Sequence, residues 1–341
     1  MSHRLRACAI LLFSSLAMPA CSATPQTGAT GDFSNRPEVQ TFIDEMVTTH
    51  GLDREELVTV FDQAQPRESI IAAMTRPAEA KPWYEYRPIF LTRSRIEGGV
   101  KFWSEHADIL RAAEEKFAVD AQVIVAIIGV ETRYGGNTGS YRVLDALSTL
   151  AFDYPPRAKF FRSELEQFLL LSREEDVDVL EVKGSYAGAM GYGQFIPSSY
   201  RHYAVDFDND GKRDLWDNPW DIIGSVANYL HEHKWELGKP VARHARVQGD
   251  GYKTLLEKGI KPATPVREMN KLGVQTNPPL PGNMKAALLE LEDKGGPEYW
   301  VVLNNFYTIT RYNRSPLYAM AVYQLSEEIR ALYESKGEGS E

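Results

Sequence analysis

Apolar residues recur every three or four positions through most of the chain, and this spacing predicts a mainly helical protein. A first helix is expected after Pro37, because proline suits the first helical turn, and Gly51 is expected to end it. Asp53 and Glu56 have the spacing of a capping box, which predicts a second helix directly afterwards.

Further helical patterns are followed by a change of character. Asp120 is expected to cap a helix that begins at Ala121. After Gly238, proline and glycine become more frequent, and residues 299–303 predict a strand. The expected class is therefore mainly α with a small β part (α+β). The other predicted helices cover residues 89–117, 157–171, 194–204, 220–234 and 315–333.

Composition excludes several classes of protein. The chain has 341 residues, of which 43% are hydrophobic, so it can bury a substantial core. Lys and Arg number 38 against 47 Asp and Glu, a net charge of −9, and this acidic balance argues against nucleic-acid binding. Two cysteines, Cys8 and Cys21, are too few for a cysteine-rich zinc site.

The first twenty residues have the layout of an export signal. Arg4 and Arg6 precede an apolar run that ends in small residues, and the run is too short to span a membrane. Cys21 follows directly, as in a bacterial lipoprotein in which this cysteine carries the lipid. Ordinary cleavage nearby, which would leave a soluble periplasmic protein, is the alternative. Residues 22–35 are rich in Thr, Gly, Ser and Pro, which indicates a flexible tether.

Glu131 is the first candidate for chemistry. It ends an almost unbroken apolar helical stretch, and Gly135 and Gly136 follow it. An apolar setting disfavours the charged carboxylate, so the pKa of Glu131 should rise toward the range of a general acid near neutral pH. The alternative is a carboxylate that is paired with Arg133 or with another cation.

A second candidate is the glycine-rich segment 185–200. Gly188, Gly191 and Gly193 allow a close backbone approach to a bulky group, and the spacing differs from that of a dinucleotide loop. The segment also offers flat aromatic faces and an amide, which suit the apolar faces and polar edges of a sugar. A tight turn that packs two helices together is the alternative.

A third candidate is an acidic loop at 206–217 with the ligand spacing of an EF-hand. Calcium is expected here as a structural ion, and an acidic surface turn is the alternative. Asp217 at the closing position has a shorter side chain than the usual Glu, so Asp221 is the better closing ligand. Lys212 would contribute its main-chain carbonyl. The expected ligands are Asp206, Asp208, Asp210, Lys212, and Asp217 or Asp221.

Three motifs together resemble those of the B-type membrane-bound lytic murein transglycosylases, and they occur in the same order. They are Glu-Thr-Arg-Tyr-Gly from Glu131, Gly-Ala-Met-Gly-Tyr-Gly-Gln-Phe-Ile-Pro-Ser-Ser from Gly188, and the acidic loop. The run 307–313, Tyr-Thr-Ile-Thr-Arg-Tyr-Asn, extends the likeness, which covers roughly residues 37–325. The resemblance implies a lysozyme-like helical core. It also implies cleavage of the β-1,4 bond between N-acetylmuramic acid and N-acetylglucosamine in peptidoglycan, which leaves a 1,6-anhydro end.

In this family one glutamate acts first as acid and then as base, and by position it is Glu131. No cofactor takes part in the chemistry. Ser185 and Gln194 are expected to bind the N-acetyl region or to orient the acid, and Arg157 to meet a peptide or lactyl carboxylate. The other residues expected to line the cleft are Tyr86, Tyr192, Phe195, Tyr229, Tyr312, Asn313 and Tyr318.

The resemblance also gives a domain plan and a location. The expected segments are a signal (1–20), a tether (21–35), a helical N-terminal domain (36–80), the lysozyme-like core with the calcium loop (81–236), a small β-containing domain (237–305) and the C-terminal part of the core (306–341). The partner is the glycan strand of peptidoglycan. We expect a monomer in the periplasm of a Gram-negative bacterium, held to the outer membrane only by a lipid anchor on Cys21.

Two other functions stay open at this point. A hydrolytic muramidase would need a second carboxylate to activate water, and Asp145 and Asp153 are the nearest in sequence. A non-catalytic peptidoglycan-binding protein would not depend on Glu131 for turnover.

Overall fold

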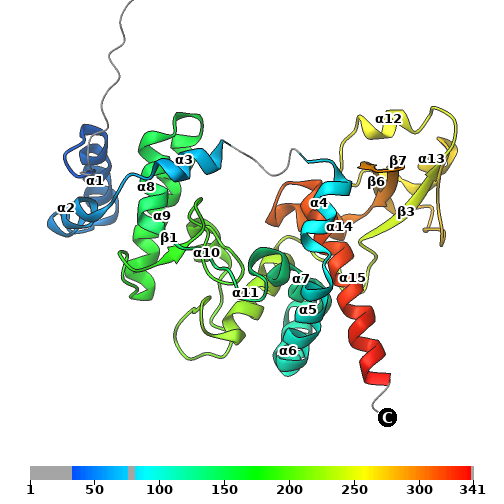
Figure 1. Ribbon diagram of the computed structural model, residues 1–341, viewed down its shortest axis with the longest axis horizontal. Helices are drawn as coiled ribbons and strands as arrows, with labels where there is room; N and C mark the ends of the chain where they lie inside the picture. The colour runs from blue at the N-terminus through cyan, green and yellow to red at the C-terminus, as the bar shows by residue number, and fades with distance from the viewer. Residues whose placement is uncertain (1–32, 76–80, 339–341) are drawn as a thin grey trace, which may run out of the picture.

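The computed structural model describes residues 33–75 and 81–338, and these residues form a mainly helical protein with one five-stranded sheet (Figure 1). The expected export signal, Cys21 and most of the expected tether lie outside the described residues. The helices in chain order are α1 (Pro37–His50), α2 (Arg54–Gln63), α3 (Glu68–Met74), α4 (Trp83–Phe90), α5 (Arg93–Glu105), α6 (Ala107–Phe117), α7 (Ala121–Thr132), α8 (Val143–Asp153), the 3-10 helix η2 (Pro155–Arg157), α9 (Ala158–Glu175), α10 (Pro197–Tyr203), α11 (Pro219–Glu232), α12 (Lys253–Leu256), α13 (Val266–Lys271), α14 (Asn304–Tyr312) and α15 (Pro316–Glu338).

The local signals at the first two helices are confirmed. Pro37 occupies the first turn of α1, and Gly51 ends that helix with a left-handed φ of 62°. The Asp53 carboxylate accepts a hydrogen bond of 2.8 Å from the Glu56 N–H at the start of α2. Phe33, which precedes α1, is fully buried, so the packed part of the chain includes residues before the expected start near Pro37.

Three predictions about helices differ from the structure. The helix expected over residues 89–117 is divided twice, because residues 91–92 separate α4 from α5 and His106 adopts a non-helical conformation between α5 and α6. Asp120 does precede α7, but its side chain accepts hydrogen bonds from Trp235 Nε1 and from Gly238 N instead of capping the helix. Glu114 supplies an acceptor for the Ala121 N–H at 2.9 Å. The expected helix over 194–204 begins only at Pro197.

The five-stranded sheet is antiparallel, in the order β4-β6-β7-β3-β5. Its strands are β3 (Ala242–Val247), β4 (Thr264–Pro265), β5 (Val274–Thr276), β6 (Lys285–Asp293) and β7 (Gly296–Val302). Residues 299–302 of the strand expected at 299–303 form the second half of β7, which begins earlier, at Gly296. A separate two-residue pair joins β1 (Tyr141–Arg142) to β2 (Lys183–Gly184).

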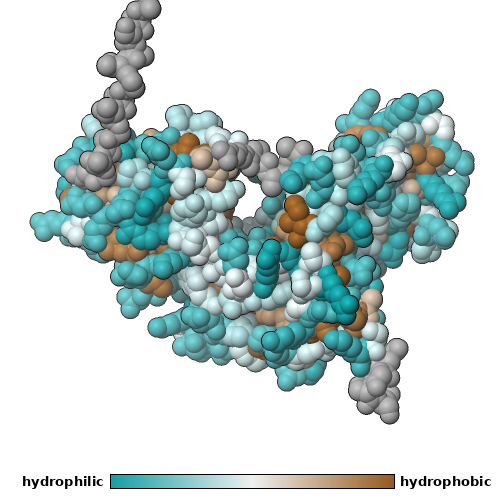
Figure 2. Space-filling model, viewed as in Figure 1, coloured by the Kyte–Doolittle hydropathy of each residue, from teal (hydrophilic) through white to brown (hydrophobic). Residues whose placement is uncertain are grey.

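Two large hydrophobic cores hold the helices. One lies among α5–α7, α11, α14 and α15 and extends to the sheet, and the other lies among α1–α3 and α8–α10. Figure 2 shows a mainly hydrophilic face that is hollowed between these two parts. None of the helices in the described ranges is long and apolar enough to cross a membrane.

Candidate active site

Glu131 lies in the last turn of α7, a helix that is buried almost throughout. Arg133 takes a left-handed conformation with φ of 53° and ends the helix immediately afterwards. In the described part of the chain, Arg133 is exposed and forms no ion pair with Glu131, so it does not supply the alternative charge partner. The helix therefore delivers a carboxyl group to the edge of an apolar core.

The surroundings of Glu131 raise its pKa as expected. Loss of hydration on burial raises the pKa to about 7, while a hydrogen bond from Tyr318 acts in the opposite direction. Tyr318, in α15, donates this bond to Glu131 Oε1 at 2.6 Å. Within residues 33–75 and 81–338, Oε2 has no hydrogen-bond partner. A carboxyl group with this pKa is present in both protonation states near neutral pH.

Several predicted cleft residues form an aromatic group beside Glu131. The ring of Tyr312 lies 4.7 Å from that of Tyr229 and 5.8 Å from that of Phe195. Burial and the proximity of Glu131 raise the pKa of Tyr312 well above its usual value, as they do for Tyr318. Tyr86 in α4 is also buried and contributes to the raised pKa of Tyr318. The phenols of Tyr312 and Tyr318 therefore remain protonated at neutral pH and donate hydrogen bonds, Tyr312 to the Gly193 carbonyl at 2.6 Å and Tyr318 to Glu131.

The glycine-rich segment packs directly against the end of α7. Thr132 Oγ1 donates to the Tyr192 carbonyl at 3.0 Å and accepts from the Gly135 N–H at 3.1 Å. Gln194 Nε2 donates to the Thr138 carbonyl at 3.0 Å. At Gly191, where φ is 67°, an added Cβ would lie 2.5 Å from the Leu215 carbonyl oxygen. The close approach that this glycine allows is thus to another part of the chain.

In the part of the chain that the structure describes, three predicted residues form no hydrogen bond or ring contact with this group of tyrosines. Ser185 Oγ accepts hydrogen bonds from the N–H groups of Ala187 and Ala189, so it shapes its own turn. Arg157 stacks on the Phe160 ring at 4.5 Å, at the start of α9. Asn313 accepts a bond from the Ser315 N–H at 3.0 Å, between α14 and α15. Their proposed roles toward substrate stay predictions.

The two aspartates considered as a second catalytic carboxylate are engaged elsewhere. Asp145 is buried and accepts hydrogen bonds from Arg67, Arg142 and the Gln65 N–H. Asp153 forms an ion pair with Arg36 at 2.6 Å. Both carboxylates therefore join the N-terminal helices to α8, in the core opposite to that of α7.

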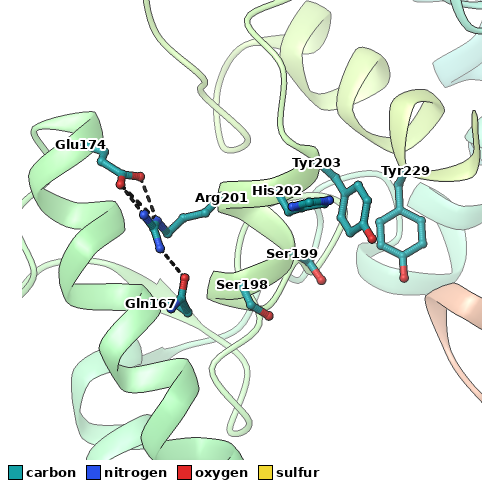
Figure 3. A pocket seen from close by; sticks show the side chains of 8 residues that line it. All are labelled: Gln167, Glu174, Ser198, Ser199, Arg201, His202, Tyr203 and Tyr229. Carbon is teal, nitrogen blue, oxygen red and sulfur yellow. Dashed lines mark hydrogen bonds and ion pairs between the residues drawn. The ribbon is translucent and has the colours of Figure 1, made fainter. Parts of the chain in front are cut away.

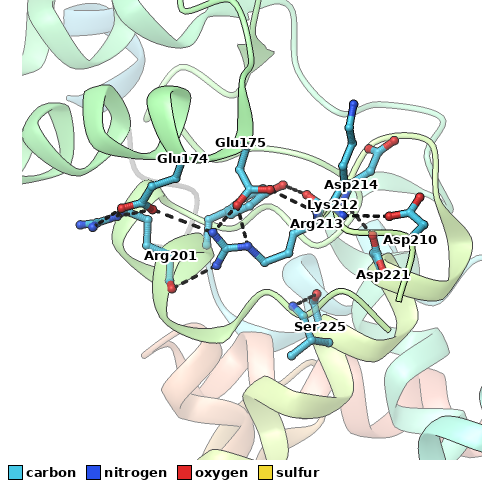
Figure 4. Close-up of polar contacts among 11 residues, drawn as sticks. Glu174, Glu175, Arg201, Asp210, Lys212, Arg213, Asp214, Asp221 and Ser225 are labelled. Carbon is cyan, nitrogen blue, oxygen red and sulfur yellow. Dashed lines mark hydrogen bonds and ion pairs between the residues drawn. The ribbon is translucent and has the colours of Figure 1, made fainter. Parts of the chain in front are cut away.

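The acidic loop gathers four carboxylates that could hold a cation. Oxygen atoms of Asp206, Asp208, Asp210 and Asp221 all lie within 4.8 Å of one another. Asp221 is fully buried, and it also accepts a bond from the Phe207 N–H at 2.7 Å and one from the Asp214 N–H at 2.8 Å. The bond between Asp214 and Asp221 is drawn in Figure 4. Burial raises the pKa of Asp221, and the nearby Asp208 and Asp206 add to this.

Asp217, the twelfth residue of the loop and the closing ligand in the usual EF-hand spacing, does not belong to this cluster. Asp217 is exposed and its N–H donates to Asp214 at 3.0 Å, while Asp221 from the first turn of α11 completes the four. Lys212 donates its N–H to Asp210 Oδ1 at 2.9 Å. Hard carboxylate oxygens on a sharp turn fit the donor set that calcium prefers.

Sequence reasoning missed two residues that shape the site. Thr132, fully buried, pins the glycine-rich segment to α7 through the bonds described above. Glu164 in α9 accepts hydrogen bonds from Ser198 N at 2.9 Å and Ser198 Oγ at 2.7 Å, and so fixes the start of α10. A hydroxyl next to Glu131 was a visible signal for Thr132, whereas Glu164 lies 34 residues from Ser198 and gave none.

A helical protein in which Glu131, with a raised pKa, accepts a hydrogen bond from a buried tyrosine at the end of an apolar helix fits the class of sugar-cleaving enzymes with a lysozyme-like core. The family model of the transglycosylase SLT domain matches residues 34–327. Membrane-bound lytic murein transglycosylase B of Escherichia coli (strain K12) is 47% identical over 309 residues, which cover 88% of this chain and 84% of that protein. The chain belongs to this family, the B-type lytic murein transglycosylases, and is a peptidoglycan-cleaving lyase.

Solved structures support the same fold. The soluble lytic transglycosylase SltB1 from Pseudomonas aeruginosa matches with a TM-score of 0.82 and 51% identity, covering 86% of this chain and 99% of that one. Escherichia coli Slt35 in complex with calcium matches with a TM-score of 0.80 and 45% identity, covering 89% of this chain and 96% of that one. The fold is therefore the mainly helical, lysozyme-like fold of these enzymes.

Proposed function

We propose that Glu131 performs both proton transfers in a non-hydrolytic cleavage of peptidoglycan. Its carboxyl group first protonates the glycosidic oxygen between N-acetylmuramic acid and N-acetylglucosamine, and the bond from the anomeric carbon to that oxygen breaks. The substrate N-acetyl group stabilises the positive charge at the anomeric carbon. The muramyl 6-hydroxyl then bonds to that carbon and returns a proton to Glu131, which leaves a 1,6-anhydro end.

The hydrogen bond from Tyr318 to Glu131 Oε1 is the observation that carries this assignment. Because Oε1 accepts from the phenol, the transferable proton belongs on Oε2, which is left for the substrate. A pKa of about 7 lets one group donate and then accept a proton at working pH. A hydrolytic mechanism would need a second carboxylate, and Asp145 and Asp153 are held by arginines elsewhere.

The glycan strand would lie along the aromatic group beside Glu131. Tyr312, Tyr229 and Phe195 offer ring faces, and Tyr86 and Tyr192 would extend the lining. We assign Gln194 and Ser185 to the N-acetyl region or to orientation of the acid, Asn313 to the lining of the cleft and Arg157 to a peptide or lactyl carboxylate. These assignments follow the matching motif positions.

Calcium would act as a structural ion in the acidic loop. Asp206, Asp208, Asp210 and Asp221 would hold it, with the Lys212 carbonyl as a further oxygen, and its charge would neutralise carboxylates that otherwise repel one another. The calcium complex of Slt35 supports this assignment. Asp217 has no place in the set that we propose.

The mature protein would start at a lipidated Cys21 and remain at the outer membrane of a Gram-negative bacterium, on its periplasmic side. The export signal pattern supports this location, as does the name of the membrane-bound relative from Escherichia coli. We propose that it works as a monomer on glycan strands. Its segments would be the signal (1–20), the tether (21–35), the helical N-terminal domain (36–80), the lysozyme-like core (81–236), the small β-containing domain (237–305) and the C-terminal part of the core (306–341).

Product analysis after digestion of purified sacculi tests the mechanism. Wild-type protein should release muropeptides with 1,6-anhydromuramic acid ends, seen by mass spectrometry, and Glu131→Gln should release none while it still binds sacculi. The matched control is Glu164→Gln, because Glu164 is another buried carboxyl group with a raised pKa and glutamine can still accept from Ser198. Reducing muramic acid ends would overturn the transglycosylase mechanism, and full turnover by Glu131→Gln would overturn the role of Glu131.

A further inference from the structure

The outer face of α10 forms the floor of a hollow with α9 on one side and α11 on the other (Figure 3). Its volume is about 730 Å³, within the range of about 300–1,000 Å³ that is usual for small-molecule sites. Glu131 does not line this hollow. It is therefore a separate place where a ligand could bind.

Tyr229 joins the hollow to the proposed cleft. Its side chain lines the hollow, and its ring packs against Tyr312 and Phe195, with centroids 4.7 and 5.7 Å away. Tyr312 in turn interacts electrostatically with Glu131. A chain molecule that crosses the aromatic group beside Glu131 would thus be led toward α10.

The charge in the hollow is already neutralised, which favours an uncharged ligand. Arg201 Nε and Nη2 donate to the Glu174 carboxylate at 2.6–3.2 Å, and Nη1 donates to Gln167 Oε1. Every nitrogen of this guanidinium is engaged, so a ligand carboxylate would have to displace Glu174. The acidic ends of stem peptides are therefore poor occupants.

The remaining groups suit a sugar. Ser199 and His202 lie one turn apart on α10, and within the described residues neither side chain has a hydrogen-bond partner. The Tyr203 ring lies 4.6 Å from His202 and 4.6 Å from Tyr229, and offers an apolar face beside these two polar groups. A pyranose with its hydroxyl and N-acetyl groups presents the complementary mixture.

We infer that Ser199, His202 and Tyr203 form a distal subsite for N-acetylated sugars of a glycan strand whose scissile bond lies at Glu131. This inference rests on the proposed function, because it concerns the same substrate. It assigns to α10 the recognition of strand length, whereas the group around Glu131 carries the reaction.

The test compares peptide-free glycan strands of four and eight sugars, prepared with an amidase, through kcat/KM for the formation of anhydro ends. Wild-type protein should prefer the longer strand. The double variant Ser199→Ala/His202→Ala should lose roughly tenfold on eight sugars, as expected for two lost hydrogen bonds, and stay within about twofold on four. His202 is exposed, so the fold should persist, and an unchanged melting temperature checks this.

The control variant is His244→Ala, which removes an exposed histidine on β3 and should leave both values unchanged. The inference is overturned by an equal loss on both strands or by no loss on either. If wild-type protein forms no anhydro ends from either strand, the proposed function itself fails, which is a different result.

Discussion

Tyr318 and Glu131 are 187 residues apart in the chain, and the tyrosine hydroxyl donates to Glu131 Oε1 at 2.6 Å. The bond joins α15, near the end of the chain, to the end of α7 in the middle of the fold. It fixes one carboxyl oxygen and leaves the other for proton transfer, so the position of α15 decides how the acid is aimed.

The raised pKa of Glu131 predicts a specific dependence of stability on pH. Between pH 4.5 and about 7 the folded state holds the proton of Glu131 more tightly than the unfolded state does. The contribution of this group to the free energy of unfolding is therefore complete below pH 4.5 and is lost as pH rises through 7. Glutamine does not titrate, so the unfolding free energy of Glu131→Gln relative to wild-type protein should increase by roughly 1–3 kcal/mol from pH 5 to pH 8. Urea unfolding at each pH measures this difference. Parallel pH curves for the two proteins would contradict this.

Tyr318→Phe should change both the rate and its pH profile. In the wild-type protein the hydrogen bond from Tyr318 lowers the pKa of Glu131. Its removal should raise this pKa, so the alkaline limb of the kcat profile should move to higher pH. We also expect kcat to fall by about tenfold, because the carboxyl group loses its fixed orientation. Tyr323→Phe is the matched control in the same helix, because the Tyr323 hydroxyl donates to the Ala242 carbonyl instead. If Tyr318→Phe leaves the pH profile of kcat unchanged, the hydrogen bond from Tyr318 does not tune the pKa of Glu131.

Removal of a loop carboxylate should abolish stabilisation by calcium. At a hundredfold excess over its Kd, an ion that binds only the folded state adds about 2.7 kcal/mol, seen as a higher melting temperature. Asp206→Ala and Asp210→Ala should lose this increase, while Asp217→Ala, outside the cluster, should keep it. An equal loss in Asp217→Ala would show that the ion sits in the simple EF-hand register.

Thr132→Val should destabilise the protein, although valine has nearly the same shape as threonine. The variant leaves the Tyr192 carbonyl without its buried donor, which should cost about 1–3 kcal/mol of unfolding free energy. Thr132→Ser keeps the hydroxyl and should lose only about 1 kcal/mol for one methyl group. Chemical denaturation of both variants, with kcat on sacculi, measures this. A valine variant more stable than the serine variant would rule out the pinning role.

Local signals were sufficient for several features. Gly51 and Asp53 act within one turn of the chain, so their roles were readable from neighbouring residues. The apolar run before Glu131 was long enough to predict both its burial and the direction of its pKa. Chemistry that depends on adjacent residues is thus well predicted from sequence.

Features set by distant partners were not predictable in the same way. Asp120 has the right position for a helix cap, but Trp235 and Gly238 compete for its carboxylate across 115 or more residues. The break at His106 leaves no proline or glycine as a marker. The preference for Asp221 over Asp217, by contrast, was readable from the sequence, and the first turn of α11 does bring the buried Asp221 carboxylate to the other three of the loop.

Tyr312 packs against both large hydrophobic cores of the protein. The position of the Tyr312 ring beside Glu131 is consequently set by how these two cores meet, and not by either core alone. Warming should loosen that junction before either core melts. Turnover should then disappear at a lower temperature than the helical circular dichroism signal, and a substrate-sized inhibitor that bridges both sides should bring the two temperatures together.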